Sequence, residues 1–334
     1  MKFIRVLLFP IVPFYYVITW LRNKLYDLDI KTSKSYDFPV VCVGNLSAGG
    51  TGKTPMVEYL IRLLKDQYRL ATLSRGYGRQ TKGFVLGSNE ASAQTLGDEP
   101  FQFYNKFKAD IEVSVDEDRQ NGISNLRTLD KQPNLIILDD AFQHRKVKAK
   151  LNILLTTYSN LYYKDIVLPT GDLREPKQGA KRAQIIVVTK CPNDLSLEEK
   201  NKIEAKLKPK PYQNVFFSSI TYGKEVIGLK GNIALSNLKT FTLVTGIANA
   251  KPLVAFFRNK GLEFNHLEYS DHHDFSKKEI ETISKNKLII TTEKDYVRLI
   301  VEENLNSKLY YLPIEVAIDN NEAFDNLVKT RIED

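Results

Sequence analysis

The stretch Pro39-Val-Val-Cys-Val-Gly44, continued by Asn45-Leu-Ser-Ala-Gly-Gly-Thr-Gly-Lys-Thr-Pro55, decides the fold. Its first part is a short apolar run typical of a buried parallel strand, and a helical pattern follows from Met56 to Lys65. Between them lies Gly49-Gly-Thr-Gly-Lys-Thr54, a glycine-rich loop that ends in a lysine and a threonine. A strand, such a loop and a helix in this order form the arrangement that cradles nucleotide phosphates. The sequence therefore predicts an α/β nucleotide-binding fold.

Each residue of this loop has an expected role. Lys53 reaches the β- and γ-phosphates, and the Thr54 hydroxyl ligates Mg²⁺. Backbone N–H groups that wrap the phosphates, aided by the helix dipole, come from Gly49, Gly50, Thr51 and Gly52. Ser47 stands where the general pattern has its first glycine, which predicts a differently shaped loop entry. The alternative is a glycine-rich turn that only links a strand to a helix.

A pair of carboxylates points to a metal ion beside the loop. The apolar run Leu135–Leu138 ends in Asp139 and Asp140, the position where phosphate-binding-loop proteins hold their metal. Carboxylate oxygens suit a hard cation such as Mg²⁺. Alternatively, the two carboxylates simply face solvent at the end of a strand.

Further strand-like runs alternate with helical segments along the chain. They are Leu70–Leu73, Ile111–Val115, Leu151–Leu155 and Ile185–Thr189, and then Phe241–Thr245, Leu288–Thr292 and Leu309–Leu312. This spacing predicts a doubly wound parallel sheet of the P-loop NTPase type with a second, smaller α/β domain, in which Ser276-Lys-Lys-Glu279 is a capping box that opens a helix. The expected division is a membrane-associated helix (1–28), a P-loop kinase domain (29–220), a linker (221–238) and a C-terminal α/β domain (239–334).

Composition limits the partners. The 334 residues carry 48 Lys and Arg against 40 Asp and Glu, a net charge of +8 that favours an anionic partner. The basic residues are scattered, with no nucleic-acid recognition pattern, so no nucleic-acid partner is expected. Cys42 and Cys191 have neither disulfide nor zinc-ligand spacing, which fits a reducing compartment.

The N-terminus predicts contact with a membrane. Sixteen residues from Val6 to Leu21 carry no charge and are flanked by basic residues. A helix of this length spans about 24 Å, shorter than the roughly 30 Å of a bilayer core. Pro10 and Pro13 would kink it, and Trp20 suits a headgroup interface. A short span and an interfacial helix both remain open, and a buried core helix is the alternative without a membrane.

Two polar loops are candidates for acid–base chemistry. Asp98 and Glu99 lie in Gly97-Asp-Glu-Pro100, where a carboxylate could accept the proton of an attacking hydroxyl, although a solvated turn fits equally well. Asp271-His-His-Asp274 is the only pair of adjacent histidines. It could hold a histidine that tunes a catalytic carboxylate across a domain cleft, or it could be a polar helix entry.

Other residues bear on the nucleotide. Candidate phosphate clamps are Arg75, Arg119 and Arg174, each of which could equally be a surface arginine. Val187-Val-Thr-Lys-Cys-Pro192 occupies the place of a guanine-reading loop, but Pro192 stands where the guanine-reading aspartate would be, so ATP is favoured over GTP.

Taken together, the motifs resemble the tetraacyldisaccharide 4'-kinases of lipid A biosynthesis over nearly the whole chain. The motifs occur in the same order after a hydrophobic N-terminal helix: Gly44-Asn45 with Gly49–Pro55, Ser74–Gly78, Gly97–Pro100, Asp139–His144, Leu168–Pro176, Gly246–Asn249, Asp271-His272 and Thr292–Asp295. The resemblance implies that ATP phosphorylates the 4'-hydroxyl of a tetraacyldisaccharide 1-phosphate, giving the 1,4'-bisphosphate. It also implies work at the cytoplasmic face of the Gram-negative inner membrane. No protein partner is expected.

The resemblance also implies roles for individual residues. Asp98 would be the base for the 4'-hydroxyl, paired with His272, and Lys53 completes the catalytic group. Asp139 and Asp140 would hold Mg²⁺ together with Thr54. Residues expected to contact substrate or nucleotide are Tyr77, Glu99, Arg119, Arg174 and Glu175, and Glu99 could also contact the metal. Thr170 and Asp172 depart from the small or apolar residues expected in their loop.

Two rival functions are a membrane-bound ATPase switch and a soluble metabolite kinase. Switches with a similar loop carry a lysine directly before the Gly-Gly pair, and here that position is Ala48. The apolar N-terminus argues against a soluble metabolite kinase. Acyl-chain preference, oligomeric state and the residues that contact adenine are not encoded in these patterns.

Overall fold

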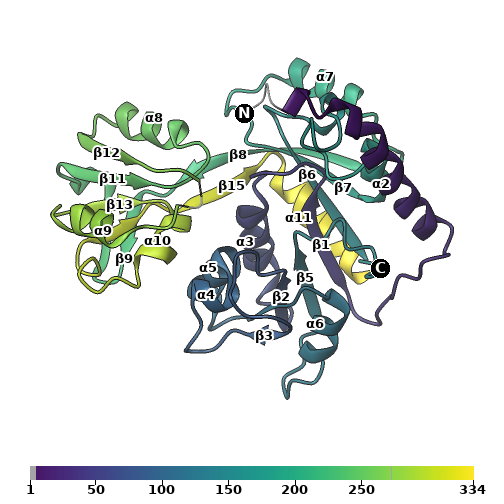
Figure 1. Cartoon of the computed structure of the whole chain (residues 1–334), viewed down its shortest axis with the longest axis horizontal. Coiled ribbons are helices and arrows are strands. Elements are labelled where there is room, and N and C mark those ends of the chain that lie inside the picture. Colours follow the sequence, from purple (N-terminus) through teal and green to yellow (C-terminus); the bar gives the residue numbers. More distant parts are fainter. Residues whose placement is uncertain (1–4, 272) are drawn as a thin grey trace.

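The computed structural model describes residues 5–271 and 273–334, and the chain folds around two β-sheets with helices on their faces (Figure 1). In the described residues the larger sheet has nine strands. Their spatial order is β15 (Ile314–Ile318), β8 (Asn214–Tyr222), β7 (Ile185–Thr189), β6 (Leu151–Thr157), β1 (Val40–Asn45), β5 (Leu135–Asp139), β2 (Leu70–Ser74), β4 (Glu112–Val115) and β3 (Val85–Leu86).

The central strands of this sheet run parallel, as a doubly wound sheet requires. From β8 to β4 every neighbouring pair is parallel, and only the edge strands β15 and β3 are antiparallel. β1 lies between β5 and β6, and all six of its residues are buried. Ligands bind such sheets beyond the carboxyl ends of the central strands, which is where β1 delivers the glycine-rich loop. The predicted fold class is confirmed.

Helices cover both faces of the larger sheet and form two cores. One core contains α3 (Lys53–Leu64), α5 (Asp98–Phe107) and α11 (Asn321–Glu333), and the other contains α6 (Arg119–Leu126) and α7 (Leu197–Leu207). Short elements in the connections are α4 (Ala93–Leu96), η2 (Tyr162–Lys164), η3 (Lys177–Arg182) and η4 (Leu235–Asn237).

The smaller sheet has its own hydrophobic cores. Its strands in spatial order are β10 (Gly231–Ala234), β9 (Glu225–Gly228), β14 (Leu309–Tyr311), β13 (Ile289–Thr291), β11 (Phe241–Thr245) and β12 (Phe264–Glu268). Its helices are α8 (Lys251–Asn259), α9 (Lys277–Ser284) and α10 (Glu293–Leu299). The capping box predicted at Ser276 and Glu279 is present at the start of α9.

The boundaries of the smaller unit differ from the expected ones. Residues 225–234, expected in a linker, form β9 and β10 of the smaller sheet. Residues 314–334, expected in the C-terminal domain, return to the larger sheet, where β15 pairs with β8 and α11 packs beside α3. β8 and β15 therefore connect the two units as a pair of strands (Figure 1). Sequence periodicity cannot reveal this return, because it says which residues are buried but not against which sheet.

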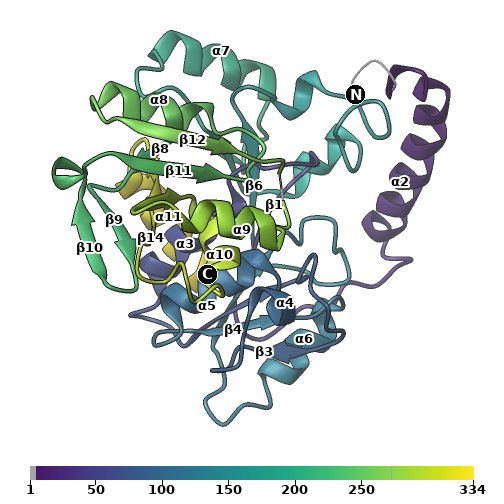
Figure 2. The same ribbon diagram turned by 60° about the vertical axis from the view of Figure 1, so that its left-hand side comes forward.

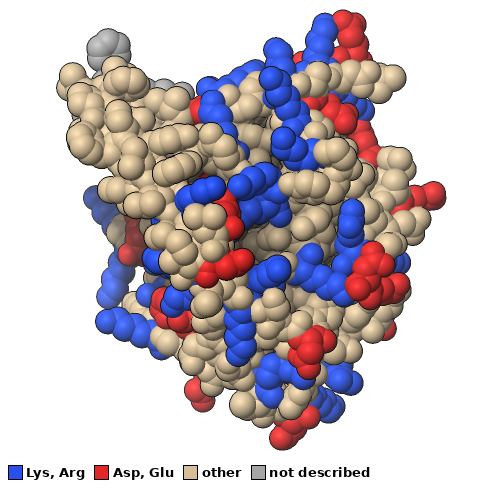
Figure 3. Space-filling view, turned by 90° about the vertical axis from the view of Figure 1, so that its right-hand side faces the viewer, with Lys and Arg blue, Asp and Glu red and all other residues tan. Residues whose placement is uncertain are grey.

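The N-terminal segment forms η1 (Phe9–Ile11) and α2 (Val12–Asp27). The expected kink becomes a boundary between them, since the prolines lie in the first turns, where a missing N–H costs nothing. One side of α2 packs on the larger sheet through Val12 and Tyr15. Its other side exposes Phe14 (72%) and Ile18 (67%), and Figure 3 shows this face as a largely uncharged area with Lys and Arg gathered beside it. None of the helices in the described ranges is long and apolar enough to cross a bilayer.

Candidate active site

The glycine-rich loop joins β1 to α3 at the carboxyl edge of the larger sheet. Gly52 caps α3 with φ of 86°, a left-handed conformation that favours glycine. Lys53 is the first residue of α3, so its side chain and the free N–H groups of the first turn lie together. The loop is thereby shaped to bind an anion at a helix N-terminus.

Side chains from neighbouring strands hold the loop in this shape. The Asn45 amide donates to the Ser47 carbonyl (2.7 Å) and to the Thr51 hydroxyl (2.8 Å). On the other side, the Thr189 hydroxyl donates to the Thr51 carbonyl (2.7 Å), and Lys190 Nζ donates to the Gly50 carbonyl (2.6 Å). Because side chains of the protein already hydrogen-bond these backbone carbonyls, the adjoining backbone N–H groups can bind phosphate.

The two predicted metal ligands have different environments. Asp139 is 1% exposed, and its Oδ2 accepts a hydrogen bond from Ser74 (3.2 Å). Its Oδ1 is buried and has no hydrogen-bond partner among the described residues. Burial, and next to it the charges of Glu99 and Asp140, raise the pKa of Asp139 to about 7. An unpartnered buried carboxylate oxygen beside a phosphate-binding loop fits a divalent cation.

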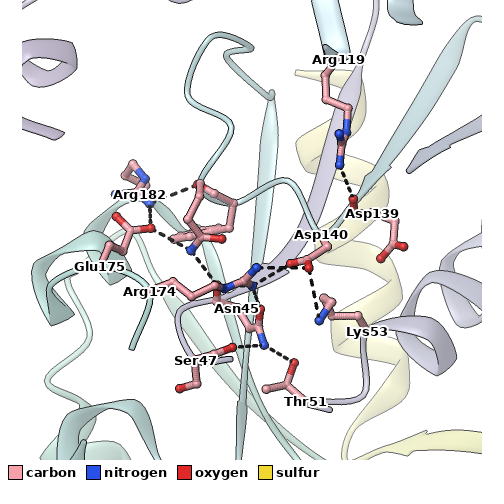
Figure 4. Close-up of polar contacts among 12 residues, drawn as sticks. Asn45, Ser47, Thr51, Lys53, Arg119, Asp139, Asp140, Arg174, Glu175 and Arg182 are labelled. Carbon is pink, nitrogen blue, oxygen red and sulfur yellow. Dashed lines mark hydrogen bonds and ion pairs between the residues drawn. The ribbon is translucent and has the colours of Figure 1, made fainter. Parts of the chain in front are cut away.

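Asp140 is linked directly to the loop (Figure 4). Its Oδ2 lies 3.7 Å from Lys53 Nζ, and its Oδ1 lies 2.7 Å from Arg174 Nη2. Burial opposes ionisation, but Lys53 and Arg174 outweigh it and lower the pKa of Asp140. Arg174 also contacts the Asn45 side chain, so the loop, the acidic pair and Arg174 form one network.

The Gly97–Pro100 turn brings a second pair of carboxylates to this edge. Asp98 is the first residue of α5, and Arg298 Nε of α10 donates to its Oδ2 (3.1 Å). The close approach of two loops requires Gly97, since a Cβ there would lie 2.9 Å from the Tyr77 carbonyl. This turn therefore packs on the loop that follows β2, the strand whose last residue, Ser74, donates to Asp139, and the charge of Glu99 adds to the raised pKa of Asp139. The site therefore brings two pairs of carboxylates to the edge of the sheet that carries the glycine-rich loop.

Comparison with known proteins agrees with this geometry. The family model for tetraacyldisaccharide-1-P 4'-kinase matches residues 4–333. The tetraacyldisaccharide 4'-kinase of Flavobacterium johnsoniae is 50% identical over 331 residues, which cover 97% of this chain and 96% of that protein. The chain belongs to the tetraacyldisaccharide-1-P 4'-kinase family. This confirms the resemblance in the motifs, and with it the expected activity as a kinase that uses ATP to phosphorylate the 4'-hydroxyl of the lipid A precursor.

Two further relatives support the assignment to the 4'-kinase family. The tetraacyldisaccharide 4'-kinase of Bacteroides fragilis is 46% identical over 90% of this chain and 86% of its own length. The crystal structure of the "apo" form of LpxK from Aquifex aeolicus in complex with ATP has a TM-score of 0.79 and 30% identity, and the match covers 98% of this chain and 99% of that one.

Among the residues expected to contact a ligand in a 4'-kinase, two are braces within the protein. Arg119 is 2% exposed and donates to the backbone carbonyls of Asp116 (2.8 Å) and Asp139 (3.3 Å). Glu175 is 1% exposed and accepts hydrogen bonds from Arg182 (2.7 Å) and from the Gln143 and Asn23 amides. Neither offers surface to a ligand, so their geometry differs from the predicted substrate contact.

The other predicted residues lie near the 4'-kinase site with unequal accessibility. Tyr77 is 79% exposed on the loop after β2, Glu99 is half-buried in the Gly97–Pro100 turn, and Arg174 is half-buried against Asp140. His272, the predicted partner of Asp98, lies outside the described residues. Among the described residues no group of three or more His, Cys, Asp or Glu side chains is arranged to hold a metal by itself.

Sequence reasoning missed two groups of the 4'-kinase site. Arg298 lies three residues beyond Asp295, the last residue of a quoted motif, and nothing in the chain order predicts that it reaches Asp98. The sequence singles out Lys190 only as part of the segment that favours ATP over GTP, yet its Nζ donates to the Gly50 carbonyl of the loop. Its φ of 57°, unusual for a lysine, is a structural sign of this role that the sequence does not carry.

Proposed function

We propose that Asp98 is the general base that takes the proton of the 4'-hydroxyl while the γ-phosphoryl group of ATP is transferred to that oxygen. The observation that carries this proposal is the packing of the Gly97–Pro100 turn on the loop after β2, whose Ser74 donates to Asp139, while Asp140 lies 3.7 Å from Lys53 Nζ. A base must lie close to both the acceptor hydroxyl and the phosphate. Arg298 orients the Asp98 carboxylate, and His272 remains its expected second partner.

Mg²⁺ fits the acidic pair. Asp139 offers a buried oxygen with no partner among the described residues, and Asp140 and Thr54 flank the start of α3. Mg²⁺ commonly keeps one or two carboxylates and takes its other ligands from phosphate and water. When bound, it neutralises charge on the transferring phosphoryl group. Lys53 adds positive charge on the phosphates, and Arg174 holds Asp140 in place.

We also propose that the enzyme works at the membrane surface, with α2 lying in the interface on the cytoplasmic side, where ATP is available. Phe14, Val17 and Ile18 of α2 are more than half exposed, while the opposite side of α2 packs on the protein. An open groove of about 670 Å³ runs from this helix to the loop and is lined by Leu8, Ile11, Tyr15, Ala48, Leu168, Pro169, Arg5 and Asp172. Extracting an acylated substrate would cost about 0.8 kcal/mol per CH₂, a cost that an interfacial enzyme avoids.

The test uses the protein in detergent micelles with Mg²⁺, γ-labelled ATP and tetraacyldisaccharide 1-phosphate. Wild type should place label in a lipid bisphosphate, and Asp98→Asn should lose this activity while remaining folded. Asp325→Asn is the matched control, because Asp325 receives a hydrogen bond from Tyr59 on the far side of α3 (2.8 Å). Full transfer by folded Asp98→Asn would refute the base assignment. Label released only as free phosphate by wild type would favour an ATPase switch.

A further inference from the structure

Four polar side chains, three of them buried and Lys106 largely so, join three helices behind the site. Glu58 lies on α3, Gln102 and Lys106 on α5, and Glu293 on α10. The Gln102 amide donates to Glu58 Oε1 and Glu293 Oε2, both at 2.7 Å. Lys106 Nζ lies 2.8 Å from Glu58 and 2.7 Å from Glu293. We call this group the three-helix clamp.

The clamp is buried although it carries three charged groups. Glu58 is 1% exposed and Glu293 and Gln102 are 7% exposed, while the Lys106 side chain is 14% exposed. A buried ion pair is weak support for stability, because desolvation offsets much of its Coulomb attraction. The clamp is therefore considered for how it fixes the relative positions of the three helices, not for its contribution to stability.

Three clamp residues, Glu58, Gln102 and Glu293, lie about one helical turn from a residue of the site, and Lys106 lies two turns from Asp98. Glu58 is five residues after Lys53, and Gln102 is four residues after Asp98. On α10, Arg298 follows Glu293 by five residues and reaches Asp98. At 1.5 Å per residue, these three residues lie about 6 to 8 Å along their helices from the site, and Lys106 lies about 12 Å from Asp98. Helices are rigid over this distance, so a shift at the clamp moves the site residues.

The clamp also joins the two units. Figures 1 and 2 show α10 of the smaller unit against α5 of the larger one, and β8 and β15 connect the units elsewhere. Two connections at different places fix an orientation that a single pair of strands would leave free to rotate. The orientation matters because Arg298 comes from one unit and Asp98 from the other.

We propose that Glu58, Gln102, Lys106 and Glu293 are positioning residues that fix Asp98 and Arg298 relative to Lys53. This inference rests on the proposed function of Asp98 as the base. A misplacement of about 1 Å can cost about a hundredfold in rate without removing any reacting group. The clamp acts on the reaction only through the residues that it positions.

The test replaces Lys106 with methionine, which leaves Glu58 and Glu293 facing each other without the cation between them. We expect Lys106→Met to lower kcat at least tenfold and to leave KM for ATP within twofold, because the loop that binds the phosphates is unchanged. Adding Glu293→Gln to Lys106→Met removes one of the two repelling carboxylates. The double variant should therefore recover at least half of the loss in log kcat. Tyr59→Phe is the control, since it removes a hydrogen bond of α3 to α11 outside the clamp.

A second readout does not depend on activity. Spin labels on Asn105→Cys of α5 and Glu303→Cys beyond α10 report the distance between the units, and both native cysteines are buried. Lys106→Met should broaden or shift this distance. The proposal would be overturned if Lys106→Met left the distance unchanged or kept kcat within twofold of wild type. It would also be overturned if Tyr59→Phe, at the same loss of Tm, lost as much kcat as Lys106→Met.

The test remains decisive if Lys106→Met does not fold or if wild type is inactive on the lipid. If Lys106→Met does not fold, Gln102→Leu replaces it, with the same expectations for kcat and distance. If wild type transfers no phosphate to lipid, the proposed function fails, and the distance measurement still decides whether the clamp fixes the two units.

Discussion

Replacing Glu175 distinguishes a brace from a substrate contact. The carboxylate is 1% exposed and receives hydrogen bonds from Arg182 at 2.7 Å, from the Gln143 amide at 3.0 Å and from the Asn23 amide. Glu175→Ala leaves the largely buried Arg182 side chain, which is 15% exposed, without its anion, and loss of one partner of a buried pair costs about 3 to 5 kcal/mol. We therefore expect the free energy of unfolding to fall by about 4 kcal/mol, a large part of the roughly 5 to 15 kcal/mol typical of a folded protein.

The assay is equilibrium denaturation in detergent, with the slope m compared between variants. Glu175→Gln keeps the shape and loses the charge, so about 2 kcal/mol is expected, as for a hydrogen bond to a charged group. Glu198→Ala is the control, because its pair with Lys202 is exposed and worth about 0.5 kcal/mol. A loss below about 1 kcal/mol in Glu175→Ala, together with a raised KM for the lipid substrate, would refute the brace and restore direct substrate contact.

Three further predictions concern the loop, the membrane face and the clamp. Lys53→Met should lower kcat at least about a hundredfold, as loss of a charge at a transferring phosphoryl group does, and unchanged label transfer would contradict the role of Lys53. The double variant Phe14→Glu, Ile18→Glu should bind anionic vesicles more than tenfold more weakly than wild type, because burial of each exposed side chain in the interface contributes about 1.5 to 3 kcal/mol. Vesicle flotation measures this binding. Equal binding by the variant and wild type would exclude α2 as the membrane contact. Burial, and then the charge of Glu58, raise the pKa of Glu293 from 4.5 to about 7, so the folded state holds more protons than the unfolded one between these values. Stability should therefore fall as pH rises through this window, by about 3 kcal/mol at most, and denaturation at pH 5 and pH 8 should show a smaller fall in Glu293→Gln.

The large sheet and its site edge could be predicted because their signals are local. Residue type alone indicates the environment of three segments: the apolar run before Asn45, the glycines after it and the aspartates after Leu138. The order of these segments in the chain then indicates the topology of the sheet. The return of the chain after Pro313 could not be predicted in this way. Val316 and Ile318 are buried beside α3, yet their alternation would fit an edge strand of either sheet.

Roles that depend on burial were equally out of reach. Arg119 and Glu175 belong to motifs typical of a ligand site, and residue type alone suggests contact with phosphate or sugar. Only the fold reveals that both are enclosed and point at their own chain. The burial of Glu58 and Glu293 could not be predicted from the sequence, because single glutamates in helices usually face solvent.

These buried charges share a pattern that follows from the chemistry. Phosphoryl transfer depends mainly on positioning and charge neutralisation, so a site for it gains from rigid surroundings more than from additional reactive groups. Glu175 connects Asn23 of α2 to the loop that carries Arg174, and the clamp connects α10 to the helices that begin at Lys53 and Asp98. The helix with the exposed apolar face and the unit that supplies Arg298 are thus both held to the site through buried carboxylates, whose net contribution to stability is small although removal of one partner alone is costly. It follows that variants at these contacts should lose rate in excess of what their stability explains, whereas apolar core variants should lose the two together.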